Sequence, residues 1–188
     1  AIMPEKKLLQ NDYVLSIGRL EHQKNFIYLL RSFIFLKKKK ISLIIIGNGK
    51  LKNHLDLFIK KKNLKNFYIL GERSNLSWFY KRSDLYVQTS LYEGMPNCIL
   101  EAAYYQKKIL IRRYDGVLSD FRKYGLRIHT TNTSEKKFSK EIENSINSIN
   151  QKKFFIINKQ KIITNNMKSK EDYKHVFTYN YLNKFYEQ

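Results

Sequence analysis

The sequence predicts an α/β fold built on a Rossmann-like, doubly wound parallel sheet, and three observations support this prediction. Short runs of β-branched, aromatic and aliphatic residues alternate with segments of helical periodicity over much of the chain. The connections between these segments are short, which is typical of parallel strands linked by right-handed helical crossovers. One run, "ISLIIIG" at residues 41–47, is apolar almost throughout, as expected of a strand covered on both faces.

Six segments have the composition of buried strands, and several of them end in a glycine or a polar loop. The expected strands are residues 13–18, 41–47, 66–71, 84–90, 108–113 and 126–130. Ligands of such sheets bind outside the carboxyl ends of the strands. We therefore expect the loops "GRLEHQKN", "GNGK", "GERSN" and "SLYEGMPN" to open on the same edge of the sheet.

Five segments are expected to be helices, most of them because apolar residues recur at helical spacing. In the first segment, Phe26, Leu29, Leu30 and Phe33 fall on one face of a helix. Asn75 is expected to cap the third helix, because asparagine is a favoured N-cap residue. The expected helices are residues 25–37, 51–63, 75–82, 97–106 and 134–150.

The domain organisation is expected to be simple. We expect one domain over residues 1–188, with a core at about residues 12–150 and a helical tail at about residues 151–188. Aromatic and aliphatic residues of that tail fall on one helical stripe, which we expect to pack against the domain. The stripe consists of Tyr173, Val176, Phe177, Tyr181 and Phe185.

The composition also indicates the compartment. No apolar run is long enough to span a bilayer. The single cysteine, Cys98, excludes an internal disulfide and suits a reducing compartment. We therefore expect a cytoplasmic location, with peripheral contact to the inner face of the membrane as a compatible option.

The chain is strongly basic, with 36 Lys and Arg against 16 Asp and Glu and a formal net charge of +20. Such an excess normally suggests nucleic acid or an anionic membrane as a partner. Here most of it comes from lysine, in a sequence also rich in the other residues that A/T-rich codons favour. We interpret most of these lysines as a solvated surface and expect no nucleic-acid partner. A basic nucleic-acid-binding module with interleaved aromatic residues is the alternative, although no RNP-type, KH-type or helix-turn-helix signature supports it.

The loop "GRLEHQKN" carries two cations at the end of the first expected strand. Gly18 lets the chain turn sharply there, which holds Arg19 and Lys24 near the start of the next helix. Arginine offers a planar fork for phosphate oxygens, and lysine offers a compact charge. Two such cations beside a helix N-terminus suit a diphosphate, and the alternative is a pair of surface charges.

The stretch "SLYEGMPNCILEA" places Glu93 and Glu101 on either side of a helix start. Pro96 lacks an N–H group and fits the first positions of a helix. The N–H groups of Asn97 and Cys98 are then free to face an anion. Carboxylates accept hydrogen bonds from sugar hydroxyls, so the whole pattern suits a nucleotide-sugar. In the alternative, Glu93 is a loop charge and Glu101 a charge near the helix start.

These two motifs together carry a family resemblance. "GRLEHQKN" followed by "EGMPNCILE" resembles the C-terminal, donor-binding half of a GT-B-fold retaining glycosyltransferase of the group 4 family, over residues 12–128. The sequence departs from the family in "YDGVLSDFRKYG", which lacks the second glycine and the proline of the usual Gly-Gly-x-Pro-Glu segment. That departure leaves Asp115 and Ser119 without a clear role.

The resemblance implies roles for individual residues. Arg19 and Lys24 would bind the diphosphate and stabilise it as a leaving group, Glu93 would hold donor-sugar hydroxyls, and these three are the expected catalytic residues. Glu101 would hold the ribose, and the backbone around Glu72 would meet the base. The resemblance implies donor contacts at Gly18, Glu72, Arg73, Gly94, Met95, Asn97, Cys98 and Glu101. It implies no metal and no cofactor beyond the nucleotide-sugar donor, with a UDP-sugar favoured.

The expected function is therefore transfer of a hexose or N-acetylhexosamine to a bacterial surface glycan, such as lipopolysaccharide or capsule. The glycan or lipid-linked acceptor would bind an N-terminal domain that we expect to be missing from this chain, which would leave it inactive alone. A glycosidase using Glu93 and Glu101 would leave Arg19 and Lys24 without a purpose. A dinucleotide dehydrogenase is disfavoured because no G-x-G-x-x-G follows the first strand. The base, the sugar and the linkage stay open.

Overall fold

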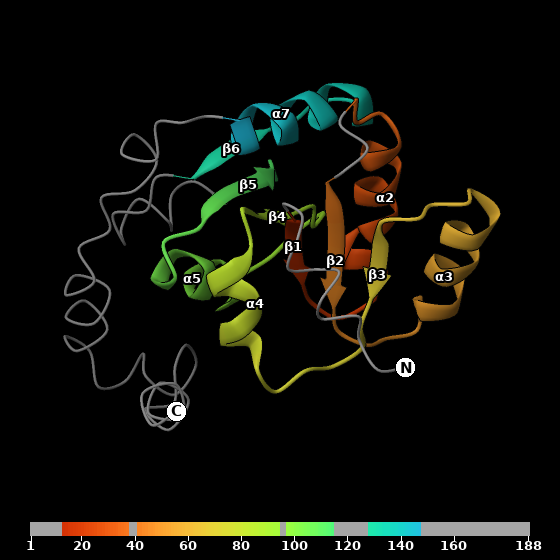
Figure 1. The fold of residues 1–188 in the computed structure, drawn as a ribbon, viewed down its shortest axis with the longest axis horizontal. Coiled ribbons are helices and arrows are strands. Elements are labelled where there is room, and N and C mark those ends of the chain that lie inside the picture. Colours follow the sequence, from red (N-terminus) through yellow and green to blue (C-terminus); the bar gives the residue numbers. More distant parts are fainter. Residues whose placement is uncertain (1–12, 38–40, 95–96, 115–127, 148–188) are drawn as a thin grey trace.

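The structure, a computed structural model, describes residues 13–37, 41–94, 97–114 and 128–147. Its centre is one six-stranded sheet in the order β3-β2-β1-β4-β5-β6, and every pair of neighbouring strands is parallel (Figure 1). The strands are β1 (Tyr13–Ile17), β2 (Ser42–Ile46), β3 (Phe67–Ile69), β4 (Leu85–Gln88), β5 (Lys108–Arg112) and β6 (His129–Thr131). The predicted doubly wound parallel sheet is confirmed.

Helices cover both faces of the sheet. Two of them, α4 and α5, lie on one face, and α2, α3 and α7 lie on the other (Figure 1). Their bounds are α2 (Phe26–Ile34), α3 (Lys52–Lys61), α4 (Leu76–Arg82), α5 (Asn97–Tyr104) and α7 (Glu135–Asn147), and a short 3-10 helix, η1 (His22–Lys24), precedes α2. No helix among the described residues is long and apolar enough to cross a membrane.

The strands hold the two layers of helices together through alternating side chains. Val14 of β1 packs with α2 on one face, and its neighbour Leu15 packs toward α4 and α5 on the other; neither is exposed. All five residues of β2 are buried, which explains why its sequence shows no polar alternation. Successive side chains of a strand point to opposite faces, so both apolar layers depend on the same strands.

Most sequence expectations on element type are confirmed, with bounds shifted by a few residues. Asn75 occupies the predicted N-cap position of α4, although its side chain makes no capping hydrogen bond. Its φ of −90° and ψ of 48° lie outside the extended region that a capping side chain requires. The predicted tail at residues 151–188 lies outside the described residues.

The strand order reverses between β1 and β4, because β2 and β3 follow on one side of β1 and β4 to β6 on the other. In doubly wound sheets this switch point is where the loops at the carboxyl ends diverge and leave a crevice. The loop after β1 is also fastened to the loop after β2. Leu20 N donates to Asn48 O at 2.8 Å, and Leu51 N donates to Leu20 O at 2.8 Å.

Close packing of these two loops depends on glycine. Gly47 has a φ of +143°, and a Cβ atom there would lie 2.0 Å from the carbonyl oxygen of Gly18. No side chain fits at that distance. The loop after β1 therefore rests directly on the backbone of its neighbour.

Candidate functional site

The candidate site lies at the carboxyl ends of β1 and β4, where two loops are joined by their backbones. Leu91 N, after β4, donates to Gln23 O in η1 at 2.8 Å. The Thr89 hydroxyl donates to the carbonyl oxygens of Lys24 and Asn25, each at 3.2 Å. These bonds set the loop after β4 against the start of α2, so two motifs far apart in the sequence form one surface.

Asn25 makes the turn between η1 and α2. Its φ of 50° and ψ of 42° place it in the left-handed region, which asparagine tolerates better than most residues. The turn closes with a bond from Asn25 N to His22 O at 3.0 Å. This local geometry ends η1 at Lys24 and starts α2 at Phe26, with Asn25 alone between the two helices.

Lys24 and Glu93 form a buried ion pair at the centre of the site. Lys24 Nζ lies 2.5 Å from Glu93 Oε1, and the two side chains are only 13% and 8% exposed. The aliphatic part of Lys24 lies over Gly18, where a Cβ atom would come within 3.0 Å of Lys24 Cε. The glycine that ends β1 therefore leaves room for the lysine to reach across to the other loop.

Neutral donors also hold the same carboxylate oxygen. Ser90 Oγ donates to Glu93 Oε1 at 2.6 Å, and Gln88 Nε2 donates to it at 3.3 Å. The other oxygen, Oε2, accepts only a long bond of 3.4 Å from Gln23 among the described residues. Glu93 thus has one anchored oxygen and one that is nearly free to accept from a ligand.

Glu101 follows the same arrangement one turn inside α5. Tyr80 OH donates to Glu101 Oε2 at 2.9 Å, and within the described part of the chain no group donates to Oε1. Burial raises the pKa of Glu101 above its ordinary value, and the bond from Tyr80 partly opposes that rise. Tyr80 itself is fully buried, so the carboxylate is held from the protein side and has one oxygen left for hydroxyl groups.

Cys98 is hydrogen-bonded both to a residue that holds Glu93 and to a residue that holds Glu101. Its Sγ donates to Gln88 Oε1 at 3.4 Å, and its carbonyl oxygen accepts from Tyr80 OH at 3.1 Å. Burial raises the pKa of the thiol, although the charge of Lys24 acts in the opposite direction. The thiol therefore keeps its proton at neutral pH and acts as a donor rather than as a nucleophile.

Other predicted site residues lie further from this cluster. Arg19 is on the same loop as Lys24, but its side chain is 72% exposed and lies 4.0 Å from Glu21. Glu72 and Arg73 follow β3, two strands away from β1, and Arg73 Nη1 donates to the carbonyl of Glu72 at 2.9 Å. Gly94 and Asn97 are exposed beside Glu93. Met95 lies outside the described residues, as do Asp115 and Ser119.

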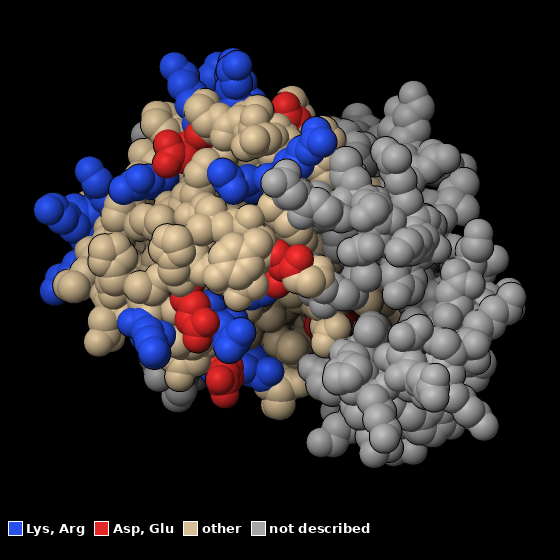
Figure 2. All heavy atoms as spheres, turned by 180° about the vertical axis from the view of Figure 1, so that it is seen from behind, with Lys and Arg blue, Asp and Glu red and all other residues tan. Residues whose placement is uncertain are grey.

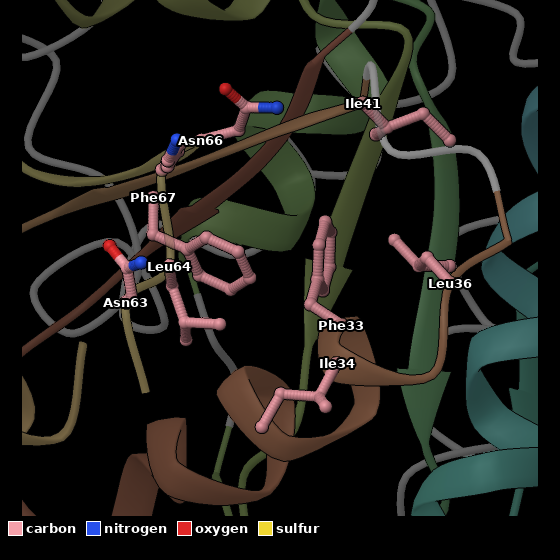
Figure 3. Close-up of a pocket in the computed structure, with 9 residues that line it drawn as sticks. Phe33, Ile34, Leu36, Ile41, Asn63, Leu64, Asn66 and Phe67 are labelled. Carbon is pink, nitrogen blue, oxygen red and sulfur yellow. The ribbon is translucent and has the colours of Figure 1, made fainter. Parts of the chain in front are cut away.

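A cavity of about 510 Å³ lies at the opposite edge of the sheet (Figure 3). Phe33 and Phe67 point toward one another across it, with ring centroids 5.7 Å apart. Ile41 and Leu64, which precede β2 and β3, complete much of its apolar lining. It therefore belongs to the amino edge and is separate from the charged cluster at the carboxyl edge.

Basic side chains are distributed over much of the surface. On the face shown in Figure 2, Lys and Arg lie mainly around the rim, with Asp and Glu among them and uncharged residues in the middle. The described part of that face therefore carries no continuous basic stripe. Among the described residues, no group of three or more His, Cys, Asp and Glu is placed to hold a metal ion.

Sequence interpretation missed four residues that shape the site, namely Gln23, Gln88, Ser90 and Tyr80. Gln88 and Ser90 had a usable signal, because polar residues at the end of a buried apolar strand face either solvent or a site. Tyr80 had none, since it lies 21 positions before its partner Glu101 on another element.

A doubly wound parallel sheet with polar side chains gathered at its switch point defines a ligand-binding α/β domain of the Rossmann-like class. The chain belongs to the family of glycosyl transferases group 1, which matches residues 2–162. The resemblance noted in the sequence is thereby confirmed.

Curated relatives match about half of the chain. An uncharacterized glycosyltransferase of Methanocaldococcus jannaschii is 42% identical over 101 residues, which make up 52% of this chain and 25% of that protein. The amylovoran biosynthesis glycosyltransferase AmsD of Erwinia amylovora is 38% identical, with 49% and 26% covered. A Campylobacter jejuni N-acetylgalactosaminyltransferase, named for a diphospho-undecaprenol-linked acceptor, is 33% identical, with 50% and 26% covered. The matched segments thus span about a quarter of these relatives' length.

Solved glycosyltransferases share the fold. The Anabaena protein HepE, solved in complex with UDP and glucose, superposes with a TM-score of 0.71 at 17% identity, covering 87% of this chain and 46% of that one. The C-terminal domain of the Francisella tularensis protein LpcC gives a TM-score of 0.68 at 17% identity, covering 85% and 89%. The expected fold, one half of GT-B, is confirmed by these structures.

Proposed function

We propose that this chain binds the nucleotide-sugar donor of a retaining glycosyltransferase, and that the donor is a UDP-sugar. The observation that carries the proposal is the pair of glutamates at the switch point, each with one oxygen anchored by the protein and the other left to accept from a ligand. Sugar and ribose hydroxyls are the donors that such carboxylates recognise.

The cations supply the other half of the recognition. Lys24 lies between the two loops, and Arg19 extends from the same loop into solvent, where it is free to close on a diphosphate. Charge-assisted bonds from both would stabilise the diphosphate more strongly as it departs than when it is bound to the sugar. Glu93 would then hold the sugar, and Glu101 the ribose. The backbone around Gly94 and Asn97 would contact the phosphate and sugar.

The names of similar proteins support a proposal for the acceptor. Its relatives include enzymes named for amylovoran biosynthesis and for a diphospho-undecaprenol-linked saccharide. We therefore propose that the complete enzyme adds a hexose or N-acetylhexosamine to a bacterial surface glycan carried on a lipid. That acceptor would bind a partner domain, and the reaction would take place in the cytoplasm at the inner face of the membrane.

Thermal-shift measurements with UDP-, GDP- and ADP-sugars test the donor class. A ligand that binds only the folded chain stabilises it by an amount that grows with the logarithm of the ligand concentration over Kd. At saturating concentrations, the correct donor should therefore raise the unfolding temperature more than the other nucleotide-sugars do. A nucleic-acid-binding module would respond to short oligonucleotides instead, and UDP would not displace them. A response to oligonucleotides alone would overturn the proposal.

Calorimetry on two variants tests the division of roles between the glutamates. Glu101→Ala should weaken both UDP and the UDP-sugar, because both ligands carry the ribose. Glu93→Ala should weaken chiefly the UDP-sugar, by about 1.5–3 kcal/mol for a lost hydrogen bond to a charged group. Glu135→Ala, at the start of α7, is the control and should change neither. Equal losses for both ligands in both glutamate variants would refute the division.

A further inference from the structure

Gln88 is a buried amide at the end of β4 that uses both ends of its side chain. It is 3% exposed, and it follows three apolar positions in the strand "LYVQ". Its Nε2 donates to Glu93 Oε1 at 3.3 Å, and its Oε1 accepts from Cys98 Sγ at 3.4 Å. A polar side chain is buried at a cost unless its groups are paired, and here the partners are two residues of the candidate site.

Cys98 determines which way the amide faces. A thiol that keeps its proton donates to the carbonyl end of Gln88, and this leaves the NH₂ end directed at Glu93. Cys98 is in turn held in the first turn of α5, where its carbonyl accepts from the buried Tyr80. The orientation of Gln88 is thus fixed by an element other than its own strand.

A bound diphosphate would change which groups hold the Glu93 carboxylate. In the unliganded site, Lys24 neutralises Glu93 across 2.5 Å. A diphosphate would compete for that lysine, because a phosphate oxygen is as good an acceptor as a carboxylate. Gln88 and Ser90 are both neutral and buried, so both would stay on Glu93 Oε1 while Lys24 shifts toward the diphosphate. Of the two, Gln88 is the one that is also bonded to α5, through Cys98.

We propose that Gln88 is a positioning residue, which keeps the Glu93 carboxylate aimed at the donor sugar when Lys24 turns to the diphosphate. The proposal rests on the proposed function, since it requires a ligand with both a diphosphate and a sugar. A merely structural role for Gln88, as a filler that satisfies buried groups, would affect every ligand alike.

The test compares UDP with UDP-glucose, or with the UDP-sugar that binds the wild-type chain more tightly, by titration calorimetry on the full chain. Gln88→Met keeps the length of the side chain and removes both hydrogen bonds. We expect the affinity for the UDP-sugar to fall about fivefold to tenfold and that for UDP to change less than about twofold, as for the loss of one hydrogen bond.

Ser16→Ala provides the matched control. Ser16 is 2% exposed on the adjacent strand β1, and its Oγ donates to Val87 O at 2.7 Å. This variant also loses a buried hydrogen bond beside β4 but leaves Glu93 untouched. It should therefore bind both ligands like the wild type.

Cys98→Ala provides a second route if Gln88→Met fails to fold. It frees the amide to rotate without removing it, so the ratio of UDP to UDP-sugar affinity should shift in the same direction by a smaller factor. Equal losses for both ligands, or unchanged affinity for both, in the variants that fold would overturn the positioning role. A wild-type chain that binds neither UDP nor any UDP-sugar would instead overturn the proposed function.

Discussion

The two edges of the sheet bury different chemistry within the same layers. At the carboxyl edge, Lys24, Glu93 and Gln88 form a buried polar cluster. At the amino edge of β2 and β3, Phe33 and Phe67 line a cavity of about 510 Å³, with no ion pair across it among the described residues (Figure 3). One edge thus buries paired charges, and the other leaves an apolar hollow.

The reason lies in the cost of each arrangement. An apolar hollow arises wherever packing is incomplete, and it costs the contacts its lining does not make. Burying a lysine and a glutamate costs several kcal/mol per ion before their attraction repays it. Stability alone is therefore a weak reason to keep such a pair at the switch point. The comparison therefore teaches that buried, paired charge is the feature that sets the carboxyl edge apart from the amino edge.

The largest expected effect comes from the amino edge. Phe33→Ala should lower the free energy of unfolding by about 3–4 kcal/mol, because it enlarges an existing cavity and removes the contact with Phe67. Affinity for UDP should stay within about twofold of the wild type, measured under conditions where the variant is folded. Phe35→Ala, at a neighbouring side chain that is 48% exposed, is the control and should cost little in urea unfolding. A large loss of UDP affinity in Phe33→Ala would remove the functional distinction between the edges.

At the carboxyl edge, Lys24→Ala should affect stability and binding together. Removing the lysine leaves the Glu93 charge, 8% exposed, without its counter-ion, which should cost about 2–3 kcal/mol in urea unfolding. UDP affinity should fall by about 1.5–3 kcal/mol.

Lys52→Ala is the matched control for Lys24→Ala. It breaks the Lys52–Asp56 pair at 2.6 Å, in which both side chains are more than 40% exposed. Such a pair is worth about 0.3–0.5 kcal/mol and lies away from the site. If both variants lost the same small amount of stability, the pairing of Lys24 with Glu93 would not be a buried one in solution.

Arg19→Ala compares an exposed cation of the carboxyl edge with the buried Lys24. The Arg19 side chain is 72% exposed, so its removal should leave the free energy of unfolding within about 0.5 kcal/mol of the wild type. UDP affinity should nevertheless fall by about 1.5–2 kcal/mol if the arginine closes on the diphosphate. Arg31→Ala, which removes an arginine of α2 that is 56% exposed, should change neither quantity. Unchanged UDP affinity in Arg19→Ala would restrict the diphosphate site to Lys24.

The smallest expected effect concerns the pH dependence of stability. Burial raises the pKa of Glu101 above its ordinary value of 4.5, so the folded chain holds this proton more tightly than the unfolded one. The stability of the wild type should therefore fall relative to Glu101→Gln as pH rises from 4.5 through the raised pKa, and the difference should then level off. Urea titrations of both proteins at several pH values measure this. Parallel pH profiles would mean that the carboxyl group is not buried in solution.

The fold could be predicted because the burial of an element determines the spacing of apolar residues within its own short segment of sequence. The run at residues 41–47 is apolar because β2 is covered on both faces, and Phe26 to Phe33 repeat at helical spacing because one face of α2 is buried. Loops after parallel strands must open on one edge, so the edge at which the loops after β1 and β4 meet could also be predicted. Asn75 shows the limit of such reasoning, because a favoured residue type does not fix the backbone angles that capping requires.

The arrangement inside the site could be predicted only in part. Arg19 and Lys24 read as an equivalent pair of cations, yet the structure exposes one and buries the other against Glu93, 69 positions away. Nothing in either loop records that contact, because it depends on the order of strands in the sheet. The anchoring bonds from Gln88 and Tyr80 were hidden for the same reason.

The contact between Gly47 and the carbonyl of Gly18 has a consequence for inheritance. A single codon change from glycine to alanine at position 47 would place a methyl group 2.0 Å from that oxygen and push aside the loop that carries Lys24. In a population, an allele with this change should impair binding as a substitution of Lys24 would, although every charged residue is still present. A survey of tolerated variants should thus find almost no substitutions at Gly47. The reason would be the close packing of two loops, and not a contact between Gly47 and a ligand.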